Sequence, residues 1–516
     1  MKYRFIKKCI FCSVGVLLLF LFIVSFYNKK LSFDDIANSR RKITGYVVDI
    51  SINNVKGIYN KLDDCYYFSF NEELDKNVRN IKVSSISKYR FKVLDDCIYD
   101  YKDGRIIVFN NSYYSIINVK YVSTPILSIL DESILDEVSV NSNEVFANSD
   151  EVFANSGEEF DSKRMVLNIS TGSAYDFSNS FSYSINGEYH VRGASSLVFE
   201  KKSYKLNFDL KNSPLGLSEG KDFVLDSLYN DSSKIRNKLS SDLWNVINDD
   251  QGYNNDLDSV FAEVFINNEY IGLYCLKNSV TKNVLSLSNI GTLLKPYTDF
   301  NEFYLEQLIA NRFLLENDSF LNFEIKYSND YNASVNAFRE RIVNLYMNNN
   351  SYDSIKSNFY IENYIDYQVL ISIVMGVDNV SKNYYLSMCD YDDKLFITPW
   401  DMDLTFGNNW DSTIFNGESF EFNSYKNVDW LDQNIIDKNS DEINELIRKR
   451  YLLLRKNVIT DDYVHDLFDQ YRHDILDNDA VIRDGERWYS YDSSFNIYAV
   501  ESWLIKRLNV LDEYFK

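Results

Sequence analysis

VDNVSKNYYLSMCDYDDKLFITPWDMDLTFG, residues 377–407, holds the pattern on which the interpretation of this chain depends. Asp378 and Asn383 are five positions apart, and Asp401 directly follows the apolar run FITPW. Phosphoryl transfer requires a carboxylate that orients the attacking hydroxyl. It also requires an amide and a second carboxylate that hold Mg²⁺ on the nucleotide phosphates. The three residues therefore predict a phosphoryl-transfer site.

The same order, with the same first spacing, is typical of protein kinases, which present Asp-x4-Asn before a metal-binding Asp. Neither His-Arg-Asp nor Asp-Phe-Gly is present in this chain. Because the sequence is rich in Asp and Asn, chance agreement is an open alternative at this point. The organisation of the flanking sequence is needed to decide between a kinase site and chance agreement.

The flanking segments predict two lobes. Residues 163–285 consist of short β-type runs, with one helical pattern of apolar residues at 232–248. After about residue 300 the periodicity becomes helical, and a β-hairpin is predicted between Asn383 and Asp401. A β-rich lobe followed by a helical lobe that carries the metal-site hairpin is the layout of a two-lobed kinase. The predicted fold class is α+β.

Two further segments are distinctive, one before the lobes and one inside the first lobe. Residues 31–124 contain alternating strand patterns broken by Asn, Asp and Gly, which predict a β-rich N-terminal module. Residues 141–160 repeat NSNEVFA with a period of seven, too short for a solenoid, and read as an acidic surface loop. The predicted domains are 1–30, 31–124, 125–290 with this loop, and 291–516.

Residues 1–30 predict a membrane anchor. An uncharged run from Cys9 to Tyr27 is long enough to cross a bilayer as one helix, and no small-x-small cleavage site follows it. The basic cluster is heavier on the N-terminal side, which favours an N-terminus inside and translocated lobes. The opposite topology stays open. The predicted location is membrane-anchored, extracytoplasmic or in a spore coat.

The composition limits the classes of partner that the chain is expected to bind. The 516 residues carry a formal net charge of −22, which argues against nucleic acid as a partner and suits cationic substrates. Simple solubility is the competing explanation of this charge. Three His residues and six Cys residues show no zinc-site spacing. Cys65 and Cys97 could pair outside a reducing compartment, or be buried thiols.

Positive charge gathers in HVRGASSLVFEKKSYKLNFDL, residues 190–210. Arg192 opens a turn between two predicted strands, and Lys201, Lys202 and Lys205 are predicted on the second strand. Lys201 and Lys205 would then share one face, with Lys202 on the other. In a kinase small lobe one such Lys reaches the nucleotide phosphates, whereas the alternative is a solvated basic edge strand.

The helix predicted behind this strand begins in LYNDSSKIRNKLSSDLWN, residues 228–245. Such a helix normally supplies an acidic partner to the lysine. Asp231 is the first candidate for it, with Arg236 beside it, and Asp242 is the second. Stabilisation of the helix N-terminus by Asp231 is the alternative role.

Taken together these segments resemble the CotH (spore coat protein H) kinase family. The family pattern combines a turn, a lysine strand, a helix start, a Gly-x-Tyr strand and two metal-site segments. All are found here in order, as RGASS (192–196), KKSY (201–204), DSSKIRN (231–237), GLY (272–274), DNVSKN (378–383) and PWDMD (399–403).

The resemblance implies an atypical protein-kinase fold that transfers phosphate from ATP, with Mg²⁺ or Mn²⁺, to Ser residues of basic spore coat or surface proteins. Asp378 would be the catalytic base, and Asn383, Asp401 and Asp403 would bind metal. The phosphates would be met by Arg192 and by the lysines at 201, 202 and 205. One departure from the family pattern is Asn278, where the family has Glu.

Two other functions compete with this one. The Asp401-x-Asp403 pair also resembles the metal clamp of nucleotide-sugar glycosyltransferases, which need a nucleotide-binding α/β unit before it. The β-rich lobe does not supply such a unit. A catalytically weak or inactive scaffold or adhesion protein of the spore coat or cell surface is the second alternative, which Asn278 and the anchor favour.

Overall fold

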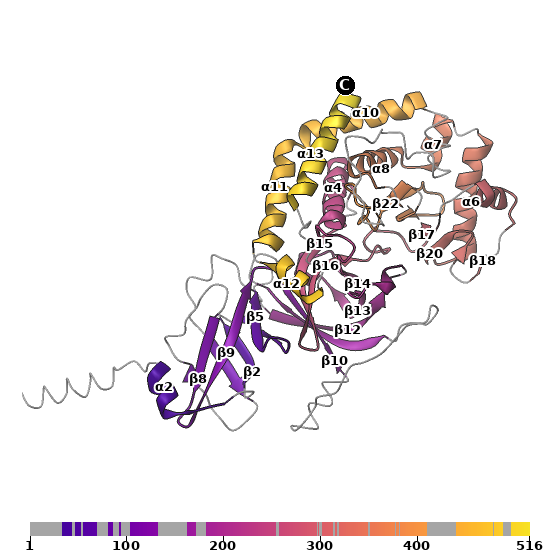
Figure 1. The fold of residues 1–516 in the computed structure, drawn as a ribbon. Helices are drawn as coiled ribbons and strands as arrows, with labels where there is room; N and C mark the ends of the chain where they lie inside the picture. Colours follow the sequence, from indigo (N-terminus) through magenta and orange to yellow (C-terminus); the bar gives the residue numbers. More distant parts are fainter. Residues whose placement is uncertain are drawn as a thin grey trace, which may run out of the picture. The chain divides into compact units, whose positions relative to one another are not determined.

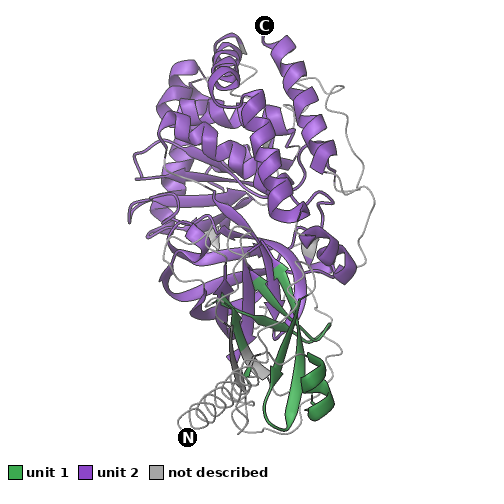
Figure 2. Cartoon of the chain, turned by 90° about the vertical axis from the view of Figure 1, so that its left-hand side faces the viewer, with its two compact units in different colours: residues 1–68, 74–121 green, residues 69–73, 122–516 purple. Residues whose placement is uncertain are grey.

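The computed structural model describes residues 33–43, 47–52, 55–69, 81–85, 92–93, 104–132, 162–171, 182–193, 195–253, 257–296, 298, 302–312, 315–316, 319–348, 351–376, 378–380, 382–409, 440–477, 479–488 and 497–516. The chain divides into two compact units, residues 1–68 with 74–121 and residues 69–73 with 122–516 (Figure 2). The predicted anchor and the repeat loop lie outside the described residues. Within the described part, no helix is both long and apolar enough to cross a membrane.

Unit 1 is built mainly of strands. One sheet has the order β4-β5-β9-β8-β7, with β1 paired in parallel to β9, and a smaller sheet has the order β3-β2-β6. Ile106 and Val108 of one strand and Ile117 and Val119 of its neighbour are buried, as alternation in half-buried strands requires. The elements are α2 (Phe33–Ser39), β1 (Arg41–Lys42), β2 (Val47–Ile52), β3 (Val55–Lys56), β4 (Ile58–Asn60), β5 (Cys65–Ser69), β6 (Ile81–Ser85), β7 (Lys92–Val93), β8 (Gly104–Phe109) and β9 (Tyr113–Val122). Cys65 is buried, while Cys97 lies outside the described residues, so their pairing stays a prediction.

The N-terminal half of unit 2, the N-lobe, is a closed barrel of strands in the order β10-β11-β12-β13-β14-β16-β15. Neighbours pair antiparallel, except that β10 and β15 close the barrel in parallel. Alternate side chains such as Leu206 and Phe208 fill the interior. The elements are β10 (Ile126–Asp131), β11 (Lys163–Ser170), β12 (Ser182–Arg192), η2 (Ser195–Val198), β13 (Ser203–Asn212), η3 (Pro214–Gly216), β14 (Gly220–Asp226), α4 (Arg236–Gln251), β15 (Ser259–Ile266) and β16 (Glu269–Asn278).

The C-terminal half of unit 2, the C-lobe, combines helices with a sheet in the order β18-β19-β20-β17-β21-β22 (Figure 1). The mixed α+β class is thus confirmed. The predicted hairpin is present as β21 and β22, and the sheet also contains four strands, β17 to β20, that were not predicted in this lobe. The elements are β17 (Thr292–Pro296), α5 (Glu302–Ile309), β18 (Leu315–Glu316), β19 (Ser319–Phe320), β20 (Phe323–Tyr327), α6 (Tyr331–Met347), α7 (Tyr352–Asn358), α8 (Ile361–Val374), η4 (Asp378–Val380), β21 (Tyr384–Met388), β22 (Phe396–Pro399), α10 (Ser440–Asn457), α11 (Asp461–Tyr471), the π-helix η6 (Arg472–Leu476), α12 (Ala480–Trp488) and α13 (Ile497–Tyr514).

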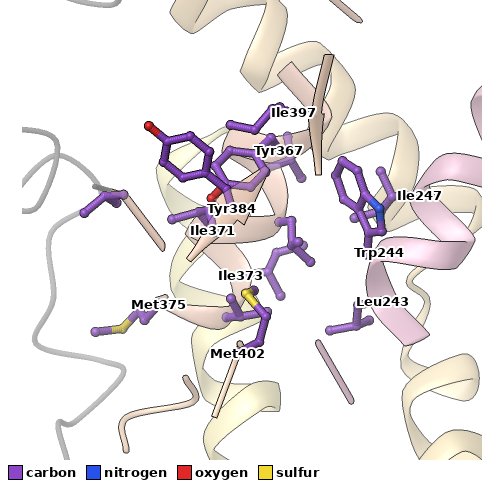
Figure 3. Packing of buried hydrophobic residues seen from close by; sticks show 14 of the residues in the cluster. Leu243, Trp244, Ile247, Tyr367, Ile371, Ile373, Met375, Tyr384, Ile397 and Met402 are labelled. Carbon is purple, nitrogen blue, oxygen red and sulfur yellow. The ribbon is translucent and has the colours of Figure 1, made fainter. Parts of the chain in front are cut away.

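Helix α4 joins the two lobes. It leaves the barrel after β14, but its apolar face lies in the C-lobe core, where Leu243 and Trp244 meet residues of α8 (Figure 3). Almost every residue of α8 is buried, as expected of a helix that is apolar on all sides. At the other end of α4, Arg450 of α10 donates to Asp366 of α8 at 2.6 Å and to the Ile247 carbonyl of α4 at 3.1 Å. The helix is therefore fixed to the C-lobe along its length.

Candidate functional site

The base of the β21–β22 hairpin brings Asn383 and Asp401 together. Tyr384 pairs with Pro399 at the last position of the hairpin, and the Trp400 N–H donates to the Asn383 carbonyl at 2.9 Å. The Asn383 amide nitrogen lies 3.5 Å from the Asp401 carbonyl oxygen. Both residues have left-handed backbone, with φ of 57° and 56°. Non-glycine residues adopt this conformation rarely and tend to do so at functional sites.

Asn379 holds the Asp378 segment against this hairpin base. Its side-chain amide donates to the Asn383 carbonyl at 2.9 Å and to the Trp400 carbonyl at 2.8 Å. The Tyr367 hydroxyl donates to the carbonyl of Asn379 at 2.5 Å, and Asn379 is fully buried. Asn379 was missed in the sequence analysis, although it lies inside the DNVSKN segment. It ties the turn that begins at the preceding residue, Asp378, to the hairpin base that carries the other two.

Asp378 itself remains accessible. Its side chain is 32% exposed, and the Lys382 ammonium lies 3.4 Å from its carboxylate. An exposed carboxylate beside an anchored backbone is what a base for an incoming hydroxyl requires. The structure therefore links the backbone segments that carry Asp378, Asn383 and Asp401.

Helix α4 anchors the residue that lies between Asp401 and Asp403. The Asn237 side-chain carbonyl accepts a hydrogen bond from the Met402 N–H at 3.3 Å, while its amide donates to Asp226 at 2.7 Å. The Met402 side chain is buried in the same cluster as Leu243 and Trp244 of α4 (Figure 3). The two aspartates therefore flank a residue that is anchored in the core.

Asp403 lies in a cluster of negative charge. Its burial, together with the Asp401 and Asp226 carboxylates, raises the pKa of Asp403 to about 8. The Asn230 side-chain amide, 3.4 Å from Asp403, opposes this shift only in part. A carboxyl group is forced towards its neutral form when nearby carboxylates have no cation to balance them.

The donor set fits Mg²⁺ on a nucleotide. In the part of the chain that the structure describes, no group of three or more His, Cys, Asp or Glu side chains could hold a metal ion. Mg²⁺ usually takes only one or two carboxylates and completes its shell with phosphate oxygens and waters. Asp401, Asp403 and the Asn383 amide meet that requirement, and the closeness of the Asp401 and Asp226 carboxylates to Asp403, which together with burial raises its pKa, favours a cation there.

We expect Asp403 to make the stability of the protein pH-dependent without divalent cations. Its native pKa lies above the value of about 3.9 in an unfolded chain, so the native state binds the proton more tightly. Its stabilising contribution is complete below about pH 4 and is lost as the pH rises through about 8. In EDTA, Asp403→Asn should therefore gain roughly 2 °C or more in Tm relative to wild type between pH 5 and pH 8.5.

The matched control for this prediction is Asp392→Asn, in the exposed turn of the β21–β22 hairpin. It should follow the wild-type curve of Tm against pH. Parallel curves for wild type and Asp403→Asn would show that Asp403 ionises normally in the native protein.

The predicted phosphate-binding cations fall in different places. The Arg192 guanidinium lies over the Trp400 ring at 5.8 Å, beside Asp401. Lys202 donates to the carbonyls of Leu197 and Phe199 at 2.6 and 2.5 Å, and so closes its own loop. Lys205 pairs with Asp222 at 3.2 Å on the barrel surface. Only Arg192 of these three contacts the hairpin base.

Lys201 is completely buried. The prediction that it lies on the same strand as Lys205 is wrong. Lys201 and Lys202 precede β13 and do not lie on it. The Lys201 ammonium donates to Asp484 of α12 at 2.5 Å and to the Leu273 carbonyl at 2.6 Å. Burial lowers the pKa of Lys201 to about 8, against the opposing effect of Asp484.

Asp231 is likewise not the partner of this lysine. Its carboxylate accepts from the Ser233 N–H and the Arg236 N–H, each at 2.8 Å, and pairs with the Arg236 guanidinium. Asp242 pairs with Lys238 and accepts from the Tyr471 hydroxyl. Asp231 and Arg236 therefore stabilise the start of α4. This is the alternative role that the sequence analysis gave to Asp231.

Two further cations surround the hairpin base. The Lys277 ammonium of β16 pairs with Asp226 at 2.8 Å and lies 4.9 Å from the centre of the Trp400 ring. Although burial acts against it, the pKa of Lys277 is raised by Asp226 and Asp401. Lys295 of β17 lies over the Tyr385 ring at 5.8 Å, and its pKa is lowered by burial despite nearby Asp401. Neither lysine was identified from the sequence.

Asn278 lies away from this group. It follows Lys277 on β16, so its side chain points to the opposite face, where it pairs in register with Phe223 of the barrel interior. Its amide donates to the Ser218 carbonyl at 2.8 Å. The departure from the family pattern therefore removes no group from the surroundings of Asp401.

The family model described as CotH kinase protein matches residues 189–515, more than half of the chain. This region includes all the residues around Asp378, Asp401 and Lys277. No curated protein matches the chain.

Proposed function

Since the chain belongs to the CotH kinase family, we propose that it is an atypical protein kinase that transfers the γ-phosphate of ATP to Ser residues of basic proteins. The observation that carries this proposal is the single buried amide of Asn379, which joins the segment of Asp378 to the carbonyls of Asn383 and Trp400. It joins the segment of the proposed base to the hairpin base that carries two of the proposed metal ligands, Asn383 and Asp401, which supports the set that phosphoryl transfer needs.

In the proposed reaction a Ser hydroxyl of the substrate lies against Asp378. The hydroxyl oxygen forms a bond to the γ-phosphorus, the bond from that phosphorus to the β,γ-bridging oxygen breaks, and ADP leaves. The hydroxyl proton passes to the Asp378 carboxylate. Lys382, 3.4 Å from Asp378, adds positive charge next to the transferred group.

Asp401, Asp403 and the Asn383 amide would hold Mg²⁺ or Mn²⁺, which neutralises charge on the phosphates when it is bound. For the phosphate-binding cations we propose Lys277 and Arg192 in place of the buried Lys201. Both reach the Trp400 ring, next to Asp401. Charge-assisted contacts from such groups are among the strongest that a phosphate can make.

The proposal for Lys277 has its own test. Lys277→Met keeps the length of the stem and removes the charge, so the KM for ATP should rise by about tenfold through loss of one charge-assisted contact. Lys205→Met, on the barrel surface, is the matched control and should keep the wild-type KM. Equal KM values for Lys277→Met and wild type would contradict this assignment.

Basic Ser-containing segments are the proposed substrates, because the net charge of −22 attracts cationic peptides. A spore coat or cell surface is the proposed location, with residues 1–30 as a membrane anchor. The function is tested with the full chain, purified in mild detergent, and ATP, Mg²⁺ and a Ser-rich basic peptide. Phosphate on Ser supports it, and no incorporation above that of a boiled sample contradicts it.

An inactive scaffold or adhesion protein is the competing proposal. Of the two features that favoured it, Asn278 faces the barrel interior rather than the site. The intact group of Asp378, Asn383 and Asp401 favours an enzyme. A protein that binds ATP with Mg²⁺ but never modifies a peptide would support the scaffold instead.

A further inference from the structure

Strand β16 contains a bulge next to helix α12 of the C-lobe. Val264 pairs with Gly272 and Phe265 with Tyr270, so Ile271 is an extra residue on β16. Gly272 has a φ of 115°, in the region that favours glycine, and a Cβ there would collide with the Asp484 carboxylate. A bulge interrupts the ladder and leaves backbone groups without strand partners.

Side chains of α12 supply partners to the backbone of this bulge. The Arg487 guanidinium donates to the Tyr270 carbonyl at 3.1 Å, and the Trp488 indole donates to the Ile271 carbonyl at 2.9 Å. The Leu273 N–H donates to Asp484 at 2.9 Å. Three backbone groups around the bulge are thus bonded by one turn of α12, which lies against β16 (Figure 1).

The Asp484 carboxylate is the centre of this contact. It is fully buried and binds Lys201 at 2.5 Å, with Lys234 at 3.5 Å. Lys201 in turn donates to the carbonyl of Leu273, so both members of the pair hold the same residue of β16. A buried ion pair of this kind fixes geometry more than it adds stability.

The bulge determines which way Lys277 points. Beyond Gly272, Tyr274 and Leu276 face the barrel interior, so Cys275 and Lys277 face outward, and Lys277 meets Asp226. Because side chains alternate, only the bulged register turns Lys277 outward to Asp226. Burying an unpaired ammonium in the apolar barrel is costly, so without the bulge this end of β16 would loosen and leave Lys277 unpaired and more accessible. The contact with Asp226 exists only in the bulged register.

We propose that Asp484 of α12 is a positioning residue for the phosphate-binding group: by holding the bulge at Gly272 it sets the register of β16 that aims Lys277 at Asp226 and the hairpin base. The importance for catalysis rests on the proposed kinase function. The register of β16 does not depend on that function and can be measured separately.

The first experiment uses limited acetylation of the full chain with acetic anhydride and mass spectrometry of the Lys277 peptide. In the wild type Lys277 is mostly buried and paired, so it should react slowly. Asp484→Ala should raise its rate several-fold, whereas Asp466→Ala, on the exposed face of α11, should leave it unchanged. An unchanged rate in a folded Asp484→Ala protein would overturn the proposal, whether or not the chain is a kinase.

The second experiment separates positioning from general stability. Asp484→Ala should raise the KM for ATP by about tenfold, and should add nothing further in a Lys277→Met background, because it acts through that lysine. Independent, additive effects of the two substitutions would overturn the proposal. No transfer by wild type would refute the kinase function and leave the acetylation result standing.

A third variant covers the case in which Asp484→Ala does not fold. Lys201→Met with Asp484→Leu removes the closest buried ion pair together, while Lys234 keeps its hydrogen bond to the Leu228 carbonyl. The Leu273 N–H still lacks its acceptor in this variant. Fast acetylation of Lys277 is expected to persist in this double variant. Wild-type acetylation would show that the carboxylate serves only to neutralise Lys201.

Discussion

Asp378→Asn is expected to lower kcat for transfer to a Ser peptide by about 10²–10⁴-fold, the usual contribution of a general base. The amide has the same size and can still contact the hydroxyl, but it cannot accept the proton. The Asn379 amide donates to the backbone carbonyls of Asn383 and Trp400, so the substitution leaves these two hydrogen bonds intact. The KM for ATP should therefore stay within about twofold of the wild-type value.

The measurement is steady-state transfer of phosphate to the peptide at several ATP concentrations. Asp392→Asn makes the same chemical change in the exposed turn of the same hairpin and should behave as wild type. An Asp378→Asn protein that retains more than about a tenth of the wild-type kcat would assign the base to another residue. A rise in KM alone would instead point to a role for Asp378 in nucleotide binding.

Asp401→Ala is expected to abolish Mg²⁺-dependent nucleotide binding, the second large effect. Ligand binding to the native state raises stability by about 2.7 kcal/mol when the ligand is at 100 times its Kd. The wild type should therefore gain Tm on addition of Mg²⁺ with a non-hydrolysable ATP analogue. Asp401→Ala should gain almost nothing, because it loses the carboxylate next to Asn383.

Two comparisons make this result specific. Asp392→Ala should show the full wild-type gain in Tm. The analogue added with EDTA should show little gain in any of the proteins. If Asp401→Ala keeps the gain that depends on Mg²⁺, the metal is held by other residues.

The parts of the site that were predicted from sequence are those that depend on short-range patterns. Asp378 and Asn383 belong to one turn, and the alternation in β21 and β22 predicted the hairpin that returns Asp401 to Asn383. Local periodicity also predicted α4 and α8. Strands β18 and β19 were missed because each has only two residues, too few for a period of two to appear.

The parts that were not predicted depend on contacts between distant segments. Lys277 meets Asp226 across paired strands, and a register of that kind is not visible in either strand alone. The expected pairing of Asp231 with a lysine failed because Arg236, five residues away, competes for the same carboxylate at the start of α4. Lys201 had a carboxylate partner as expected, but one that lies 283 residues further along the chain.

The separation of 283 residues between Lys201 and Asp484 affects how the chain folds during synthesis. A ribosome delivers the barrel strands first, and the nascent N-lobe then carries Lys201 and the β16 bulge without the helix that completes them. A product truncated before residue 480 would contain Asp378, Asn383 and Asp401, yet its barrel would hold a buried ammonium without its carboxylate and backbone groups without acceptors. Such fragments should be poor at folding and readily degraded by proteases. The contacts around the β16 bulge are therefore complete only once helix α12 has been synthesised.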